Sequence, residues 1–205
     1  PGIIAQPSSS TINAGSTASL TIVANGSKPL SYQWYQGAVG VTTTPVGTNS
    51  SNFTTPALTD SAMYWVRVSN AVGTVDSTLS TISVRPIITT QANSQVIDAG
   101  ATATLTVIAS GPAPLSYQWY QGAVGVTTSP VGTNSSSFTT PALSSNTTYW
   151  VRVSNSAGSV DSASSTISVR PSITTQPGSS TINSGATTTL TVVASGPTPI
   201  TYQWY

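Results

Sequence analysis

The residue types that most often carry out chemistry in proteins are scarce in this sequence. Its 205 residues include no histidine, cysteine or glutamate, and its four carboxylates are Asp60, Asp76, Asp98 and Asp161. General acid–base catalysis needs two titratable groups in one pocket, and a nucleophilic serine needs a neighbouring base. Zinc requires nitrogen or sulfur ligands, and calcium requires clustered carboxylates. We therefore expect no enzymatic activity, no cofactor and no metal site.

Charge and hydropathy argue against two further classes of partner. The formal net charge is +1 and the five cations are scattered singly, whereas a nucleic-acid binder presents a basic face. No window approaches the roughly 18 consecutive apolar residues of a membrane-spanning helix. We expect neither nucleic-acid binding nor membrane insertion by this segment. Without cysteine, each domain must be held by its core and not by disulfides.

The sequence repeats with a period of 85 residues. The triplet Gln-Trp-Tyr occurs three times, centred on Trp34, Trp119 and Trp204. Residues 1–85 and 86–170 are identical at 58 of 85 positions without a gap. A unit of this length suits a small independent domain better than a solenoid repeat. We predict one domain over 1–85, a second over 86–170, and the first strands of a third over 171–205, which indicates a window on a longer array.

Short segments of alternating apolar residues, separated by glycine and proline, fill each unit. This pattern predicts β-strands. In the first unit we expect strands over 18–24, 30–36, 52–58 and 64–70, and a last strand that ends at Val84. Six or seven short strands in 85 residues predict an all-β fold, with one β-sandwich per unit.

The spacing of the landmark residues resembles the immunoglobulin fold in its intermediate-set form. The resemblance rests on the pattern Gly15-x4-Leu20-x-Ile22-x-Ala24-x-Gly26, then Trp34, then Asp60-x-Ala62-x-Tyr64-x-Val66-x-Val68-x-Asn70-x2-Gly73. It departs from that pattern at Ser145 and Thr147, where the second unit lacks the Asp-x-Ala of the first. Fibronectin type III is the rival sandwich.

The resemblance implies specific core residues. Trp34 and Trp119 resemble the core tryptophan of strand C, and Tyr64 and Tyr149 resemble the tyrosine corner of strand F. The two disulfide cysteines of the family fall on Ile22 and Val66 in the first unit, and on Val107 and Val151 in the second, so packing replaces the bridge. Tandem cysteine-free units of this kind are typical of large secreted bacterial surface proteins, which implies an extracellular or cell-surface location.

No flexible linker separates the units. Arg85 is followed directly by Pro86, and Arg170 by Pro171. Proline fixes its own φ and pushes the preceding residue into an extended conformation. We therefore expect short, stiff joints and a rod of sandwiches.

The outer face of strands C and F is the candidate interaction surface. If Trp34, Tyr64 and Val66 point inward, alternation sends the intervening side chains outward. The expected patch consists of Gln33, Tyr35, Trp65 and Arg67, and it recurs as Gln118, Tyr120, Trp150 and Arg152. Two alternatives stay open. Arg67 could stack on Trp65 while the loop after strand C covers both, or the inward and outward faces could be reversed.

These features favour a structural protein, such as a stalk, surface layer or filament. Its partner would be neighbouring copies that pair laterally through the aromatic patch, since a periodic surface suits an assembly. An adhesin that binds glycan or a surface protein through the same patch is one alternative. A passive spacer beside a functional domain outside this segment is another.

Overall fold

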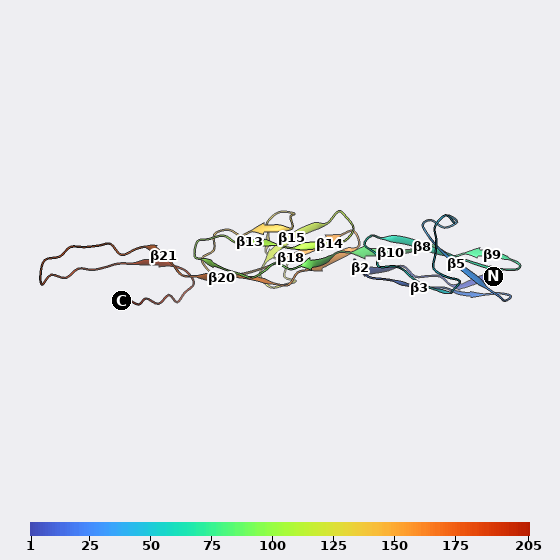
Figure 1. Ribbon diagram of the computed structural model, residues 1–205, viewed down its shortest axis with the longest axis horizontal. Helices are drawn as coiled ribbons and strands as arrows, with labels where there is room; N and C mark the ends of the chain where they lie inside the picture. Colours follow the sequence, from blue (N-terminus) through green and yellow to red (C-terminus); the bar gives the residue numbers. More distant parts are fainter. The chain divides into compact units, whose positions relative to one another are not determined.

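The computed structural model describes all residues 1–205, which form strands, turns and loops but no helix (Figure 1). No helix is therefore available that could span a membrane. The expectation of an all-β fold built from tandem immunoglobulin-like sandwiches is confirmed.

Repeat 1, residues 1–85, contains ten strands. They are β1 (Gly2–Ala5), β2 (Ser10–Asn13), β3 (Ser19–Thr21), β4 (Val23–Asn25), β5 (Ser31–Gln36), β6 (Pro45–Val46), β7 (Asn52–Thr54), β8 (Ala62–Asn70), β9 (Gly73–Asp76) and β10 (Ser80–Arg85). One sheet has the order β2-β10-β8-β5-β6, with β9 also paired to β8. The strand pairs β1–β4 and β3–β7 complete the sandwich.

Repeat 2 has the same topology. Its strands are β11 (Ile87–Thr90), β12 (Gln95–Asp98), β13 (Thr104–Thr106), β14 (Ile108–Ser110), β15 (Ser116–Gln121), β16 (Pro130–Val131), β17 (Ser137–Thr139), β18 (Thr147–Asn155), β19 (Gly158–Asp161) and β20 (Ser165–Arg170). The main sheet runs β12-β20-β18-β15-β16, and the pairs are β11–β14 and β13–β17.

Three predicted strands differ from the observed ones. The segment 18–24 is divided into β3 and β4, because β3 pairs with β7 whereas β4 pairs with β1. The segment predicted over 52–58 ends as a strand at Thr54, two residues before Pro56. The last strand is divided into β9 and β10. Choice of pairing partner is a long-range property, so the local pattern does not reveal these divisions.

A bulge divides the last strand of repeat 1. Arg67 pairs with Asp76 on β9, but Tyr64 pairs with Ser80 on β10, so one extra residue lies on this side of the ladder. The buried side chain of Ser77 bridges the gap. Its hydroxyl oxygen accepts a hydrogen bond from the Val66 backbone N–H (2.9 Å) and donates one to the Thr78 carbonyl (2.9 Å).

The core of each sandwich is built around its tryptophan, as predicted. Trp34 is fully buried, its ring centroid lies 5.7 Å from that of Phe53, and Phe53 contacts Tyr64 at 5.3 Å. The Trp34 indole N–H donates to the Ser50 carbonyl oxygen (3.0 Å). The disulfide positions Ile22 and Val66 are buried apolar residues.

Repeat 2 reproduces this core. Trp119 and Tyr149 are buried, Trp119 Nε1 donates to the Ser135 carbonyl oxygen (2.9 Å), and Phe138 contacts both rings. Val107 and Val151 are likewise buried.

One glycine of the core is required by a close approach. Gly47 has a φ of +70°, and a Cβ atom at this position would lie 2.8 Å from the ring of Phe53. Gly132 stands in the same relation to Phe138, at a φ of +72°. Glycine adopts this conformation at no steric cost, so the aromatic ring can pack directly against the backbone.

Residues 171–205 form one strand pair, β21 (Ser172–Thr175) with β22 (Val193–Ser195). Apolar side chains of this segment are about half exposed, among them Ile173 and Leu190. Trp204 is 49% exposed, whereas its counterparts Trp34 and Trp119 are fully buried. The strand pair of this segment does not enclose Trp204.

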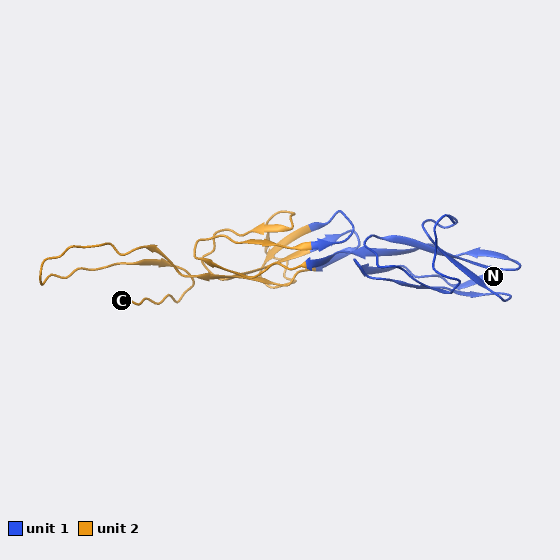
Figure 2. Ribbon diagram, viewed as in Figure 1, with its two compact units in different colours: residues 1–89, 109–116, 153–160 blue, residues 90–108, 117–152, 161–205 orange.

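Contacts between Cα atoms divide the chain into two compact units (Figure 2). The first contains residues 1–89, 109–116 and 153–160, and the second contains residues 90–108, 117–152 and 161–205. This division does not follow the boundaries of the sequence repeats, because residues 86–89, 109–116 and 153–160 of repeat 2 belong to the first unit.

Strands β2 and β10 of the main sheet are joined by side-chain hydrogen bonds in addition to their backbone ladder. β2 and β10 run parallel, with Ser10 opposite Ile82 and Asn13 opposite Arg85. Four side-chain hydrogen bonds, each across 72 residues of sequence, join the same two segments. They are Thr78 N to Gln6 Oε1 (2.9 Å), Ser80 Oγ to Ser8 O (2.9 Å), Thr81 N to Ser9 Oγ (2.9 Å) and Arg85 Nε to Asn13 Oδ1 (2.6 Å). We call this arrangement the terminal-strand seam.

Repeat 2 has an equivalent seam between β12 and β20. Its side-chain bonds are Ala163 N to Gln91 Oε1 (3.0 Å), Ser165 Oγ to Ala92 O (2.6 Å), Thr166 N to Ser94 Oγ (3.0 Å) and an ion pair of Arg170 with Asp98. Two features differ. The acceptor of the serine hydroxyl is Ala92 O, one position before the equivalent of Ser8, and Asp98 takes the place of Asn13.

The carboxylate of Asp98, at the position of Asn13, predicts an acid sensitivity confined to the seam of repeat 2. The hydrogen bond from Arg170 lowers the pKa of Asp98 below its ordinary value of 3.8. A carboxylate with a lowered pKa stabilises the fold above its unfolded pKa, and this contribution is lost as the pH falls through the folded pKa. When the pH is lowered below about 4, we expect the melting temperature of repeat 2 to decrease more in the native chain than in an Asp98→Asn variant. Calorimetry measures both melting temperatures.

The reciprocal variant Asn13→Asp is the control, and it should make repeat 1 acid-sensitive in the same range. If Asp98→Asn left the acid dependence of the chain unchanged, Asp98 would not be its source.

Candidate interaction surface

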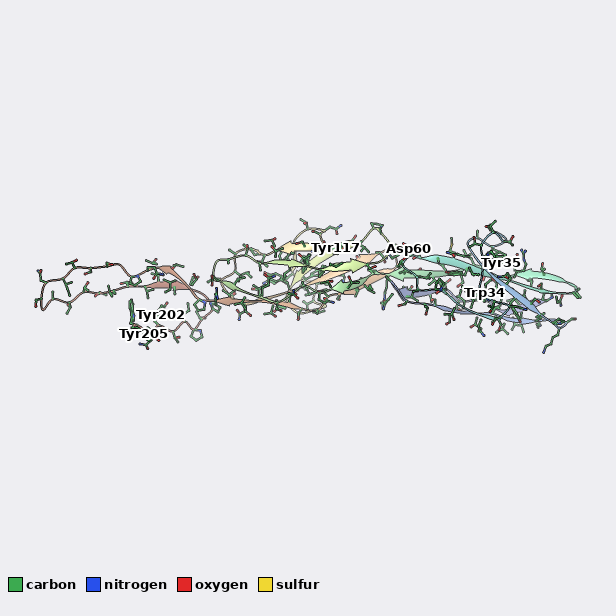
Figure 3. The ribbon with its side chains drawn as sticks, in the orientation of Figure 1. Trp34, Tyr35, Asp60, Tyr117, Tyr202 and Tyr205 are labelled. Atoms are coloured by element: carbon green, nitrogen blue, oxygen red, sulfur yellow. The ribbon has the colours of Figure 1, made fainter.

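Adjacent strands of the main sheet carry the residues of the predicted patch. β5 and β8 pair antiparallel, with Tyr35 opposite Trp65 and Gln33 opposite Arg67. Trp34 belongs to the core cluster, while its neighbour Tyr35 stacks on Trp65, so these two lie on opposite faces of the sheet (Figure 3). The predicted alternation is therefore correct, and the reversed assignment of faces is wrong.

The prediction that Trp65 and Trp150 are exposed is wrong. Both are fully buried, although they lie on the outer face. The ring of Tyr35 stacks on Trp65 with centroids 4.6 Å apart and planes at 20°, and the Arg67 guanidinium lies 5.3 Å from the indole centroid. Alternation assigns a residue to a face, but long side chains on neighbouring strands decide whether solvent reaches it.

The same arrangement recurs in repeat 2. Tyr120 stacks on Trp150 at 4.6 Å and 20°, with the Arg152 guanidinium 5.4 Å from the indole. The alternative in which arginine stacks on tryptophan is thus the observed one. The cover is completed by a tyrosine, where we had expected the loop after β5.

A bidentate ion pair fixes each arginine over its tryptophan. Arg67 Nε and Nη2 donate to the two carboxylate oxygens of Asp76 at 2.7 and 2.8 Å, and this hydrogen bonding raises the pKa of Arg67. In repeat 2 the Arg152–Asp161 distances are 2.6 and 2.8 Å, and the pKa of Arg152 is raised for the same reason. Ion pairs this accessible to solvent add little to stability, so their main effect is to orient the guanidinium.

We call Tyr35, Trp65, Arg67 and Asp76, with their equivalents in repeat 2, the outer-face cluster. It presents a half-buried tyrosine and a half-buried ion pair to solvent. The indole nitrogens of Trp65 and Trp150 are buried without a hydrogen-bond partner, and nothing in the structure explains this. An unpaired N–H of this kind costs about 1–3 kcal/mol, which the stacking and burial of the ring must offset.

The two glutamines of the predicted patch donate hydrogen bonds to backbone carbonyl groups. Gln33 Nε2 donates to the carbonyl oxygens of Trp34 and Val46, both at 3.0 Å. Gln118 makes the same two bonds in repeat 2, at 2.9 and 3.0 Å. These bonds tie β5 to β6 and β15 to β16, so both amides are already engaged within the sheet.

The carboxylates are distributed as the sequence suggested. Asp76, Asp161 and Asp98 each pair with an arginine, and Asp60 accepts a hydrogen bond from the Thr59 hydroxyl (3.3 Å). Three of the four are thus paired with arginine.

Sequence reasoning missed an open groove of about 560 Å³ on repeat 2. It lies between the loop after β15, residues 121–124, and the turn that leads into β18, residues 145–148. A signal was available, because the repeats differ at every position from 59 to 63.

Comparison with known proteins identifies one matching family. The model of the CHU_C-associated Ig-like domain matches residues 1–86 and again residues 85–171. No curated protein matches the chain at a significant level.

Solved structures of tandem immunoglobulin domains resemble the chain at low identity. The titin fragment I67–I69 is 16% identical over 85% of this chain and 68% of its own, with a TM-score of 0.42. The Ig1-2 module of Drosophila receptor protein tyrosine phosphatase DLAR is 19% identical over 82% and 97%, with a TM-score of 0.36. The first four domains of Dscam1 isoform 6.9 are 20% identical over 80% and 43%, with a TM-score of 0.48. These likenesses bear on neither function nor partners.

The stacked tyrosine predicts how the buried indoles respond to mutation. Tyr35→Ala combined with Tyr120→Ala should open both indoles to water and lower the free energy of unfolding by about 1–2 kcal/mol per repeat, because a stacked aromatic pair is lost. Acrylamide quenching of tryptophan fluorescence and chemical denaturation measure the two effects.

Tyr35→Phe with Tyr120→Phe keeps the stacked rings and serves as the control, with quenching close to that of the native chain. Unchanged quenching in the alanine variant would mean that other side chains shield Trp65 and Trp150 from solvent.

Proposed function

Because the chain belongs to the CHU_C-associated Ig-like domain family, we propose that it is a non-enzymatic extracellular repeat module that carries tension along a stalk, surface layer or filament. The observation that supports this most strongly is the terminal-strand seam, which is present in both repeats.

The seam lies where force along the chain would act. In repeat 1 the chain passes through β1, which pairs with β4, before it reaches β2, and it leaves at Arg85, the last residue of β10. Once β1 is released, force along the chain acts on β2 and β10. Because β2 and β10 are parallel, pulling on the two ends slides the strands past each other. The backbone bonds of the ladder and the four side-chain bonds are then strained together and not one after another. A pair loaded in this way resists rupture more than one that opens from one end.

Hydroxyl groups supply much of the surface bonding in place of charges. On the exposed faces of β3 and β7, Thr21 Oγ1 donates to Asn52 Oδ1 (2.8 Å), and in repeat 2 Thr104 and Thr139 share a hydrogen bond between hydroxyls (3.0 Å). Only 4% of the residues are charged. Neutral hydrogen bonds are not screened by salt, so such a surface keeps its interactions when ionic strength changes, as it does outside a cell.

Lateral pairing of copies through the outer-face cluster stays a prediction. With Trp65 and Trp150 buried, the apolar area of the cluster that a partner could cover comes mainly from one half-buried tyrosine per repeat. The adhesin alternative has a different support, the groove on repeat 2. The spacer alternative requires neither surface.

The seam predicts a specific mechanical phenotype. Ser9→Ala with Ser94→Ala removes the acceptors of Thr81 N and Thr166 N, and it should lower the force at which each repeat unfolds in single-molecule pulling. Forced unfolding follows the unfolding rate, so bonds at the point of loading have the largest effect.

The matched control is Thr21→Ala with Thr106→Ala, which removes exposed hydroxyl bonds from β3 and β13, outside the seam. Each deleted bond should cost about 1 kcal/mol at equilibrium in either variant. If both variants lowered the unfolding force equally, resistance would follow overall stability, and the seam would have no special mechanical role.

A further inference from the structure

The groove on repeat 2 has one wall that both repeats share and one wall in which they differ. The first wall is Gln121-Gly-Ala-Val124, which is identical to Gln36-Gly-Ala-Val39 of repeat 1. The second wall is Ser145-Asn-Thr-Thr148 together with Ser164. Its counterpart in repeat 1 is Asp60-Ser-Ala-Met63 with Leu79, so all five positions differ. Over the whole repeat only 27 of 85 positions differ.

The backbone that carries the differing wall is the same in both repeats. Gly37 N donates to the Met63 carbonyl oxygen at 2.8 Å, and Gly122 N donates to the Thr148 carbonyl oxygen at 2.8 Å. A side chain of the turn holds the last strand in each case, with Ser61 Oγ accepting from Val84 N and Asn146 Oδ1 accepting from Val169 N. Different side chains are thus displayed on one rigid frame, as expected of positions that determine specificity.

The chemistry of the wall differs sharply between the repeats. In repeat 1 the corresponding positions include Met63 and Leu79, which are 44% and 38% exposed, and the exposed Asp60. In repeat 2 the same positions present hydroxyl and amide groups, and no residue that lines the groove is charged.

Several of these polar groups in repeat 2 are held in position. Asn146 Oδ1 accepts from Val169 N (2.7 Å), which directs its amide group, and Thr147 Oγ1 donates to the Ser145 carbonyl oxygen (3.1 Å). The Thr148 hydroxyl lies 3.5 Å from that of Thr166. Pre-oriented donors and acceptors lose less entropy when a ligand binds.

We propose that this groove is a binding site for a neutral glycan. A charged ligand would find no opposite charge in the lining, and an apolar ligand would strip water from hydroxyl and amide groups without replacing their hydrogen bonds. A neutral sugar supplies many hydroxyls that act as both donors and acceptors, and its C–H faces can rest on Val124, which is 45% exposed. The corresponding site of repeat 1 rejects the same ligand, because Met63 and Leu79 leave its hydroxyls unpaired.

This binding role goes beyond the mechanical role and does not depend on it. The terminal-strand seam involves none of the groove residues, so either function can fail without the other.

The test is a titration of the 205-residue chain with neutral tetrasaccharides of glucose, mannose, galactose and xylose, followed by NMR. We expect saturable binding of one of them at one site, with dissociation constants on the order of millimolar or tighter. The variant that gives repeat 2 the wall of repeat 1 should weaken binding at least tenfold. It carries Ser145→Asp, Asn146→Ser, Thr147→Ala, Thr148→Met and Ser164→Leu.

The reciprocal exchange is the gain-of-function arm, and it should raise the number of sites from one to two. It carries Asp60→Ser, Ser61→Asn, Ala62→Thr, Met63→Thr and Leu79→Ser. Both walls already occur in a folded repeat, so calorimetry should show that the variants fold. Binding that persists after the first exchange would overturn the proposal. So would the absence of binding to any neutral tetrasaccharide, or binding only to an acidic oligogalacturonate or to a serine- and threonine-rich peptide.

Discussion

Each sandwich depends on one tryptophan enclosed between its two sheets. Trp34 fills the interior, contacts Phe53, and satisfies its indole N–H at the Ser50 carbonyl oxygen. No disulfide supplements this packing, since the chain has no cysteine. Because side chains alternate along a strand, placing Trp34 inward also places Tyr35 outward. The core contact and the arrangement of the outer face therefore follow from one constraint.

A chain with few charges must find other means to join distant segments. Here serine and glutamine side chains bond to backbone groups 72 residues away and join the segment around β2 to the segment around β10. Such bonds are individually modest, about 0.5–1.5 kcal/mol. They all lie between β2 and β10, two strands that run parallel at one edge of the main sheet.

The two repeats keep their core and vary at a few surface positions. Residues 31–43, which contain β5 and most of the loop after it, are identical to residues 116–128, whereas the turn before β8 differs completely from the turn before β18. The hydrogen bonds that hold these turns are nevertheless equivalent. One frame can thus carry an apolar surface in one repeat and a hydroxyl-rich groove in the next.

The sequence alone determined the repeat length, the all-β class and the division of strand side chains between two faces, whereas the structure decided that Trp34, Tyr64 and Val66 point inward. The 85-residue period and the local alternation of apolar residues can be recognised without knowing which strands pair. Tertiary structure decided that Trp65 is covered by Tyr35 and Arg67, and that β10 lies beside β2 with side chains bonded across the seam. It also placed the turn before β18 against the loop after β15. Each of these depends on which strands meet and in what register, and that is set by packing between residues far apart in the chain.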